Sequence, residues 1–163
     1  MKINKERDAE WKQYILDNFT CDPETGNIKS KTGRASIFLN NRTGYLYIKI
    51  DKNIIYSFHR VCWLLYYGEF PTEIDHINHN RIDNRIMNLR ECTTSQNNAN
   101  ALIRKDNSSG YKNVAWSNQR NKWYVRIQKE GYRKAYAFFD SIDDAIKEAD
   151  RLRKELHGEF AHS

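Results

Sequence analysis

Closely spaced cysteines and long apolar runs are both missing from this sequence. The three cysteines, Cys21, Cys62 and Cys92, are widely separated, and no Cys-x-x-Cys element is present. Zinc sites built on thiolates need closely spaced cysteines, so we expect no structural zinc. No apolar run approaches the ~18 residues of a membrane-spanning helix, and no signal peptide opens the chain. We therefore expect a protein of the reducing cytoplasm that does not enter a membrane.

Internal repeats and low-complexity tracts are absent too, but aromatic residues are abundant. They make up 13% of the 163 residues, whereas disordered segments are usually poor in them. Hydrophobic residues reach 39%, which allows a modest core. The chain is long enough for one ordinary domain or two small ones.

Positive charge is concentrated in one segment. The formal net charge is +6, and the sequence pI is near 9.2. Residues 104–134 contain nine Lys or Arg and two acidic residues, a net of +7, so the rest of the chain sums to −1. Such segregation favours a nucleic-acid partner over a generally solubilising charge.

Apolar periodicity predicts an α+β fold in two parts. Helical spacing marks the N-terminal segment through Trp11, Ile15 and Phe19. The further elements expected in the first domain, residues 1–102, are a hairpin over 44–59, a helix from 58 ended by Gly68, and a helix capped by the Thr/Thr/Ser run at 93–95.

A second small domain is expected over residues 110–163, after a polar linker at 103–109. Its sequence reads as three short strands separated by turns, followed by a helix that Ser141 can cap. Three strands covered by one helix make a minimal two-layer module.

The stretch 73–100 is unusually polar and contains seven asparagines. A disordered linker, a surface loop and a site that holds a metal and a base are all open interpretations. Asp75 can hold a hard divalent cation, and the neighbouring imidazole of His76 can accept a proton near neutral pH. Asn97 lies early in the capped helix, which could bring its amide oxygen close to Asp75. This set suits metal-assisted phosphodiester hydrolysis, although Asn-rich loops often make Asx turns and a lone histidine is usually structural.

Residues 19–101 resemble the HNH endonuclease family, specifically the homing-type enzymes of bacteriophages and introns. The motifs that carry the resemblance are the His-Arg pair at 59–60, Asp-His at 75–76, the run N-x-x-D-N-R-x-x-N-L-R at 80–90, and S-x-N-N at 95–98. The resemblance implies a ββα-metal fold and cleavage of DNA to 5′-phosphate and 3′-hydroxyl ends.

The resemblance also implies residue roles. His76 would be the general base, and Asn88 the central asparagine that ties the loop together and orients the imidazole. Asp75 and Asn97 would bind one Mg²⁺, for which Mn²⁺ or another divalent cation could substitute. His79 stands where relatives usually have glycine and could be a turn residue, a phosphate contact or a spare imidazole.

Other polar residues of this region have open roles. His59 is expected to be a cap or packing element of its helix, and Arg60 is a candidate for contacting a phosphate. Asn84, Asn98 and Asn100 are expected to make loop or helix-end hydrogen bonds, with DNA contact as the alternative.

The second domain is predicted to present one face of its sheet to DNA. Alternation along "KWYVRIQ" places Val125 and Ile127 under the helix and leaves the intervening side chains on the open face. Arg and Gln on such a face suit guanine and adenine in a major groove, although a solvated face is the ordinary alternative. Trp116 could contact a sugar or pack in the hairpin. The candidate DNA contacts in both domains are Arg60, Lys112, Trp116, Arg120, Lys122, Tyr124, Arg126, Gln128, Arg133 and Lys134.

Residues 108–161 resemble the APETALA/ethylene-response-factor DNA-binding domain, through "GYKNV", "KWYVRI", "FFDSIDDAIKEAD" and "HGEFA".

From the two resemblances together we expect a phage-type, site-specific endonuclease that acts on double-stranded DNA in the cytoplasm of a bacterial host, as a monomer or homodimer and without a small-molecule cofactor. A DNA-binding regulator or packaging-associated protein that uses the HNH unit as a scaffold is the alternative. A structural RNA-binding protein is a less favoured third.

Overall fold

The chain combines helices and strands, as predicted, and divides into two compact units. A computed structural model describes residues 5–33, 35–101, 103, 106–129 and 132–160, with the side chains of 5, 128–129, 132–136 and 159 left undescribed. The units are Met1–Cys92 and Thr93–Ser163. Within the described parts of the chain, no helix has the length and apolar character needed to cross a bilayer.

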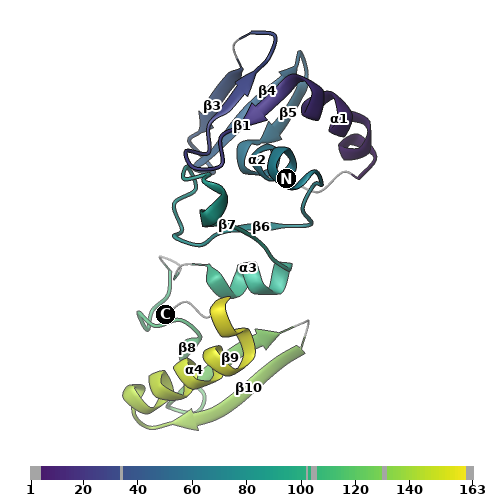
Figure 1. The fold of residues 1–163 in the computed structure, drawn as a ribbon. Helices are drawn as coiled ribbons and strands as arrows, with labels where there is room; N and C mark the ends of the chain where they lie inside the picture. The colour runs from purple at the N-terminus through teal and green to yellow at the C-terminus, as the bar shows by residue number, and fades with distance from the viewer. Residues whose placement is uncertain (1–4, 34, 102, 104–105, 130–131, 161–163) are drawn as a thin grey trace. The chain divides into compact units, whose positions relative to one another are not determined.

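The first unit is built from antiparallel strands and two helices (Figure 1). Its sheets are the pair β1–β2, the three strands β3–β4–β5 and the pair β6–β7. In chain order the elements are α1 Lys5–Asn18, β1 Phe19–Cys21, β2 Ile28–Ser30, β3 Ser36–Asn40, β4 Tyr45–Asp51, β5 Ile54–Ser57, α2 Phe58–Tyr67, β6 Ile74–His76, the 3₁₀ turn η1 Ile86–Asn88 and β7 Leu89–Glu91.

The core of the first unit forms where α2 packs against the strands. Ile48 and Ile50 of β4 are buried with Val61 and Leu64 of α2, as the alternation of the strand requires. Gly68 ends α2 in the left-handed conformation at φ 79°, and its N–H donates to the Leu64 carbonyl at 2.8 Å. This core supports β6 and the loop that follows it.

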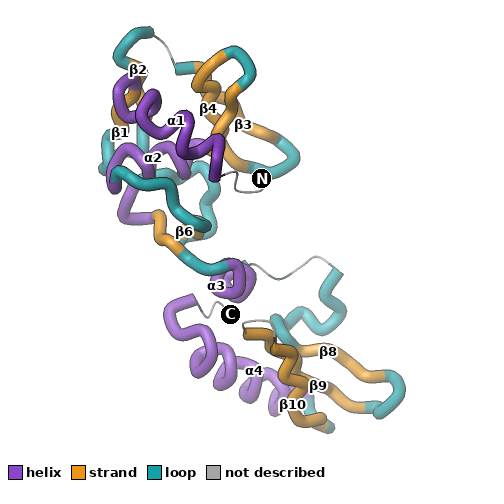
Figure 2. The backbone as a smooth tube through the Cα atoms, turned by 90° about the vertical axis from the view of Figure 1, so that its right-hand side faces the viewer, coloured by secondary structure: helices purple, strands orange, loops and turns teal. Residues whose placement is uncertain are grey.

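The second unit contains a three-stranded antiparallel sheet in the order β10–β9–β8, with α4 along one face (Figure 2). Val125 and Ile127 of β9 are buried against Ala145 and Ala149 of α4. The Ser141 side chain caps α4 by accepting from the Asp143 N–H at 3.1 Å. The elements are α3 Thr94–Asn100, β8 Val114–Ser117, β9 Lys122–Lys129, β10 Tyr132–Phe139, α4 Ile142–His157 and η2 Gly158–Phe160.

The boundary between the compact units follows Cys92, ten residues before the predicted end of the first domain. The helix α3 therefore falls in the second unit. A reciprocal capping box starts this helix: Gln96 N–H donates to Thr93 Oγ1 at 3.2 Å, and Thr93 N–H donates to Gln96 Oε1 at 2.7 Å. The predicted linker includes 104 and 105, which lie outside the described residues. Its end is an ordered turn, since Asn107 Oδ1 accepts from the Ser109 and Gly110 N–H groups at 3.0 and 2.8 Å.

Candidate active site

The short pair β6–β7 positions Asp75 and His76 on opposite faces. Asp75 pairs with Arg90 and His76 with Leu89 across the ladder. Both side chains are buried, with His76 only 4% exposed. The imidazole of His76 lies against Tyr45 and His59, with ring centroids 5.8 and 5.2 Å away. The strand therefore directs the candidate base inward and the carboxylate to the other side.

Asn84 holds the imidazole of His76. Nε2 of His76 lies 3.2 Å from Oδ1 of Asn84, whose own amide nitrogen donates to the Ile82 carbonyl at 3.1 Å. Burial lowers the pKa of His76, and the hydrogen bond to Asn84 partly opposes that shift. The ring is therefore neutral near pH 7, which is the state a general base needs.

Asn88 ties the loop together but does not reach the imidazole. Its Oδ1 accepts from the Asn78 N–H at 3.0 Å, and its Nδ2 donates to the Asp83 carbonyl at 2.7 Å. The side-chain hydrogen bond to the ring comes from Asn84, and the role expected for Asn88 in orienting the imidazole stays a prediction. Asn84 is part of the 80–90 motif and was expected to make a loop or helix-end hydrogen bond, but its bond to His76 was not foreseen.

His79 is a turn residue. It has φ 61°, and its N–H donates to the His76 carbonyl at 3.0 Å. Glycine adopts this left-handed conformation without strain, so a glycine would suit the position. The turn bends the chain directly after β6.

His59 lies in the first turn of α2 and packs against both Tyr45 and His76. Its ring centroid is 5.2 Å from each of theirs. Its Nδ1 is buried and has no hydrogen-bond partner among the described residues. Burial, with a smaller contribution from His76, lowers the pKa of His59 to about 3. His59 is thus a neutral packing residue at the edge of the site, in line with the packing role expected for it.

Arg60 is part of the scaffold. Its guanidinium donates to the Pro71 carbonyl at 2.8 Å and to Asp8 Oδ2 at 2.9 Å, and its side chain is 15% exposed. A cation nearer the site was missed by sequence reasoning: Arg81 lies over the Tyr45 ring, 4.9 Å from its centroid, and donates to the Thr43 carbonyl at 2.7 Å.

Asp75 is oriented by Arg90. The guanidinium donates through Nε and Nη2 to the same carboxylate oxygen, at 2.8 Å each. Across the described parts of the chain, no cluster of three His, Cys, Asp or Glu side chains could hold a metal ion. Asn97, the other predicted ligand, lies on α3 in the second unit, so its pairing with Asp75 stays a prediction.

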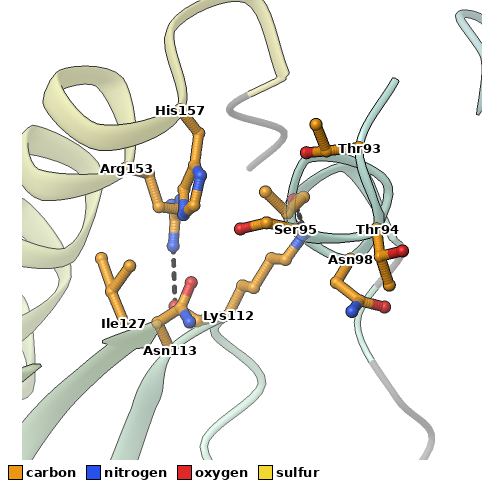
Figure 3. Close-up of a pocket in the computed structure, with 10 residues that line it drawn as sticks. Thr93, Thr94, Ser95, Asn98, Lys112, Asn113, Ile127, Arg153 and His157 are labelled. Atoms are coloured by element: carbon orange, nitrogen blue, oxygen red, sulfur yellow. Dashed lines mark hydrogen bonds between the residues drawn. The ribbon is translucent and has the colours of Figure 1, made fainter. Parts of the chain in front are cut away.

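A cavity of about 630 Å³ lies between α3, α4 and β9 within the second unit (Figure 3). The side chain of Lys112 extends toward α3, where its ammonium donates to the Ala99 and Ala101 carbonyls. Burial and nearby Arg153 lower the pKa of Lys112 to about 8, and Arg153 donates to the Lys112 carbonyl at 2.7 Å. The ammonium of Lys112 therefore binds the end of α3, and its predicted contact with DNA stays a prediction.

The open face of the second sheet carries exposed Arg126 between two buried residues of β9. Tyr124 packs on Phe138 at 6.1 Å, and Arg120 lies 4.4 Å from the Phe138 ring centroid. Lys122 pairs with Asp140 at 3.0 Å.

The remaining predicted contacts lie at the ends of the strands. Trp116 is 42% exposed and packs edge-on against Trp123 at 5.1 Å. The backbone of Arg133 pairs with Gln128, and that of Lys134 with Ile127. The side chains of Gln128, Arg133 and Lys134 are outside the described ones.

Comparison with known proteins places part of this chain in a family. The sequence pattern of the HNH endonuclease family matches residues 56–99. "Protein 3.8" of Escherichia phage T7 is 34% identical over 88 residues, which cover 54% of this chain and 72% of that protein. "Uncharacterized HNH endonuclease L560" of Acanthamoeba polyphaga mimivirus is 32% identical over 100 residues, 60% of this chain and 51% of that protein. The chain thus spans about half the length of the mimivirus relative. No solved structure matches it.

The candidate site thus combines a buried neutral histidine with the carboxylate that precedes it on β6. The chain belongs to the HNH endonuclease family, whose members are nucleases that act on DNA and typically use divalent metals. The family match ends before residues 108–161. The resemblance of that segment to the APETALA/ethylene-response-factor domain therefore gains no support from it and stays a prediction.

Proposed function

We propose that this protein is a homing-type endonuclease that hydrolyses double-stranded DNA at specific sites with the help of one divalent cation. The observation that carries the proposal is the buried, neutral imidazole of His76, hydrogen-bonded at Nε2 and preceded by the carboxylate of Asp75. A neutral imidazole can activate a water molecule for attack on the phosphate, which favours direct hydrolysis.

In the proposed reaction His76 accepts a proton from a water molecule. The water oxygen then forms a bond to the scissile phosphorus, and the bond to the 3′ oxygen breaks. The phosphate stays on the 5′ end, and the 3′ oxygen leaves as a hydroxyl after protonation. His76 becomes an imidazolium and returns its proton to solvent before the next turnover.

Asp75 and Asn97 would hold the divalent cation, for which we propose Mg²⁺. A carboxylate and an amide oxygen are hard ligands, and Mg²⁺ usually takes only one or two protein ligands together with water and phosphate. When bound, the cation would stabilise the charge on the phosphate and on the leaving oxygen. The hydrogen bonds from Arg90 fix the Asp75 carboxylate in one orientation for this task.

The second unit would select the DNA site. Its basic segment and the exposed Arg126 on the open sheet face suit a DNA duplex. Arg120 and Tyr124 both contact the ring of Phe138 and are further candidates. Gln128 and Arg133 are the further candidates for reading bases. In this proposal the APETALA/ethylene-response-factor-like unit binds the DNA, and the HNH unit cleaves it.

The test compares the full chain with two histidine variants. Supercoiled and linear phage DNA are incubated with Mg²⁺, Mn²⁺ or EDTA, and products are resolved on a gel. The expected result is discrete metal-dependent cuts that His76→Ala abolishes while DNA affinity changes less than a few-fold. His79→Gly is the matched control and should still cleave, because glycine fits its turn. Tight binding without cleavage under any divalent metal would instead favour the DNA-binding regulator.

A further inference from the structure

The hydrogen bond between His76 and Asn84 has a defined direction. The Asn84 amide nitrogen donates to the Ile82 carbonyl, so its Oδ1 is the atom that faces the imidazole. An amide oxygen accepts and cannot donate, so Nε2 of His76 must carry the hydrogen. The lone pair of the neutral ring is then on Nδ1. Asn84 is itself buried, with 3% exposure, so water does not compete strongly for this bond.

Asn84 is held in turn by residues far upstream in the sequence. The turn at 22–27, closed by the Gly26 N–H donating to the Asp22 carbonyl at 2.8 Å, packs against the backbone of Asn84. A Cβ on Gly26 would lie 2.4 Å from the Asn84 carbonyl carbon and 2.6 Å from its oxygen. The Ile86 N–H also donates to the Pro23 carbonyl at 3.0 Å.

The turn is attached to α2 as well. The thiol of Cys62 donates to the Gly26 carbonyl at 3.4 Å, and Cys62 is fully buried. Three separate contacts therefore fix the turn against the core and the Asn84 loop. Neither the loop nor the turn can shift alone without losing one of them.

We propose that Asn84 is a positioning residue that keeps the hydrogen on Nε2 of His76 and makes Nδ1 the basic nitrogen, and that the turn at 22–27 holds Asn84 for this task. The inference rests on the proposed function, since a fixed basic nitrogen matters for catalysis only if His76 accepts a proton. The competing interpretation is that Asn84 only fills a buried space next to the ring.

Two variants of Asn84 separate these interpretations. Asn84→Asp keeps an acceptor oxygen, whereas Asn84→Leu keeps the branched shape without an acceptor. Both lose the donor to Ile82, so the difference between them isolates the bond to His76. The full-length proteins are labelled with ¹⁵N-histidine, and the His76 signals are assigned by their loss in His76→Gln. The ¹⁵N resonances show which ring nitrogen carries hydrogen, at a pH where the ring is neutral.

The wild type and Asn84→Asp should show hydrogen on Nε2. Asn84→Leu should lose this preference, and its cleavage kcat should fall about 10–100-fold, as is usual for partners that orient a catalytic group, with little change in KM. A leucine variant with an unchanged tautomer and rate would show that Asn84 only fills space.

The wild-type spectrum is decisive even if the leucine variant does not fold, because hydrogen on Nδ1 would overturn the inference. The NMR result also does not depend on activity. Failure of the wild type to cleave DNA would count against the proposed function alone, while the tautomer would still test the role of Asn84.

Discussion

His59 brings a buried, unpartnered nitrogen next to the candidate base. Its Nδ1 lacks a hydrogen-bond partner among the described residues, and its ring packs between Tyr45 and His76. A buried polar atom without a partner costs roughly 1–3 kcal/mol. The cost grows in acid, because protonation would bury a charge and place it near His76 and Arg60.

The protein should therefore lose stability as pH falls below about 6.5. The pKa of His59 is lowered to about 3 in the folded chain, so the unfolded chain binds its proton first. Stability from the neutral ring is fully present above the unfolded pKa and is lost toward pH 3, by ~1.4 kcal/mol per pH unit. Urea unfolding at several pH values measures the slope. His59→Phe keeps a ring there and should flatten the slope; an unchanged slope would assign the acid loss to other groups.

Arg60 should contribute to stability through its ion pair with Asp8. Arg60→Ala should lower the free energy of unfolding by about 3 kcal/mol, because it leaves the buried Asp8 carboxylate unpaired. DNA affinity measured on folded protein should not change. Arg60→Ala with Asp8→Ala is the control, and it should recover part of the lost stability. A selective loss of DNA affinity with unchanged stability would restore the phosphate contact expected from the sequence.

Residue types and their spacing in the sequence indicated some residues of the candidate site but not others. Asp75 and His76 stand out because adjacent strand residues must diverge, and the asparagine-rich run predicted a loop tied by side chains. The bond from Asn84 to His76 could not be predicted, since it depends on how the loop folds against the turn at 22–27. The partners of Arg60, Asp8 and the Pro71 carbonyl, are distant in sequence and could not be predicted either, and its contact with a phosphate stays a prediction.

At the scale of elements, the turn at 22–27 can be tested by two glycine substitutions. Gly26→Ala should reduce cleavage and change the His76 resonances, because a Cβ there meets the Asn84 backbone. Gly68→Ala is the matched control: it has the same sign of φ, but no atom lies within 4 Å of the position that a Cβ would take. Both should lose about 1 kcal/mol or more of stability from the strained conformation. Equal effects on cleavage would show that only backbone strain matters.

Helices whose spacing and terminal residues mark them in the sequence were predictable. The division of the helices and strands into compact units was not. The capped helix α4 and the helix ended by Gly68 followed from side-chain spacing and terminal residues. One contact between α3 and the rest of its unit is Lys112 binding the Ala99 and Ala101 carbonyls, which lie about a dozen residues before it. A lysine in a basic segment gives no sign of such a role.

For the whole molecule, the distribution of charge predicts a strong salt dependence of DNA binding. Arg126 is exposed on the open sheet face, so Arg126→Ala should weaken binding and lower the log–log salt slope by ~0.9 if one phosphate contact is lost. Lys147→Ala, an exposed lysine on α4, is the control and should leave the slope unchanged. A loss confined to particular base sequences, with the slope intact, would show that Arg126 reads bases.

The contact between Gly26 and Asn84 also limits how far the chain can be shortened from its N-terminal side. Residues 56–99, the part that matches the family, contain the base and its loop but not the turn against which that loop packs. A chain shortened to begin after residue 30 would retain every HNH motif and lose the support of Asn84. A fragment that keeps the support of Asn84 therefore has to start before residue 22, well upstream of the residues that match the family.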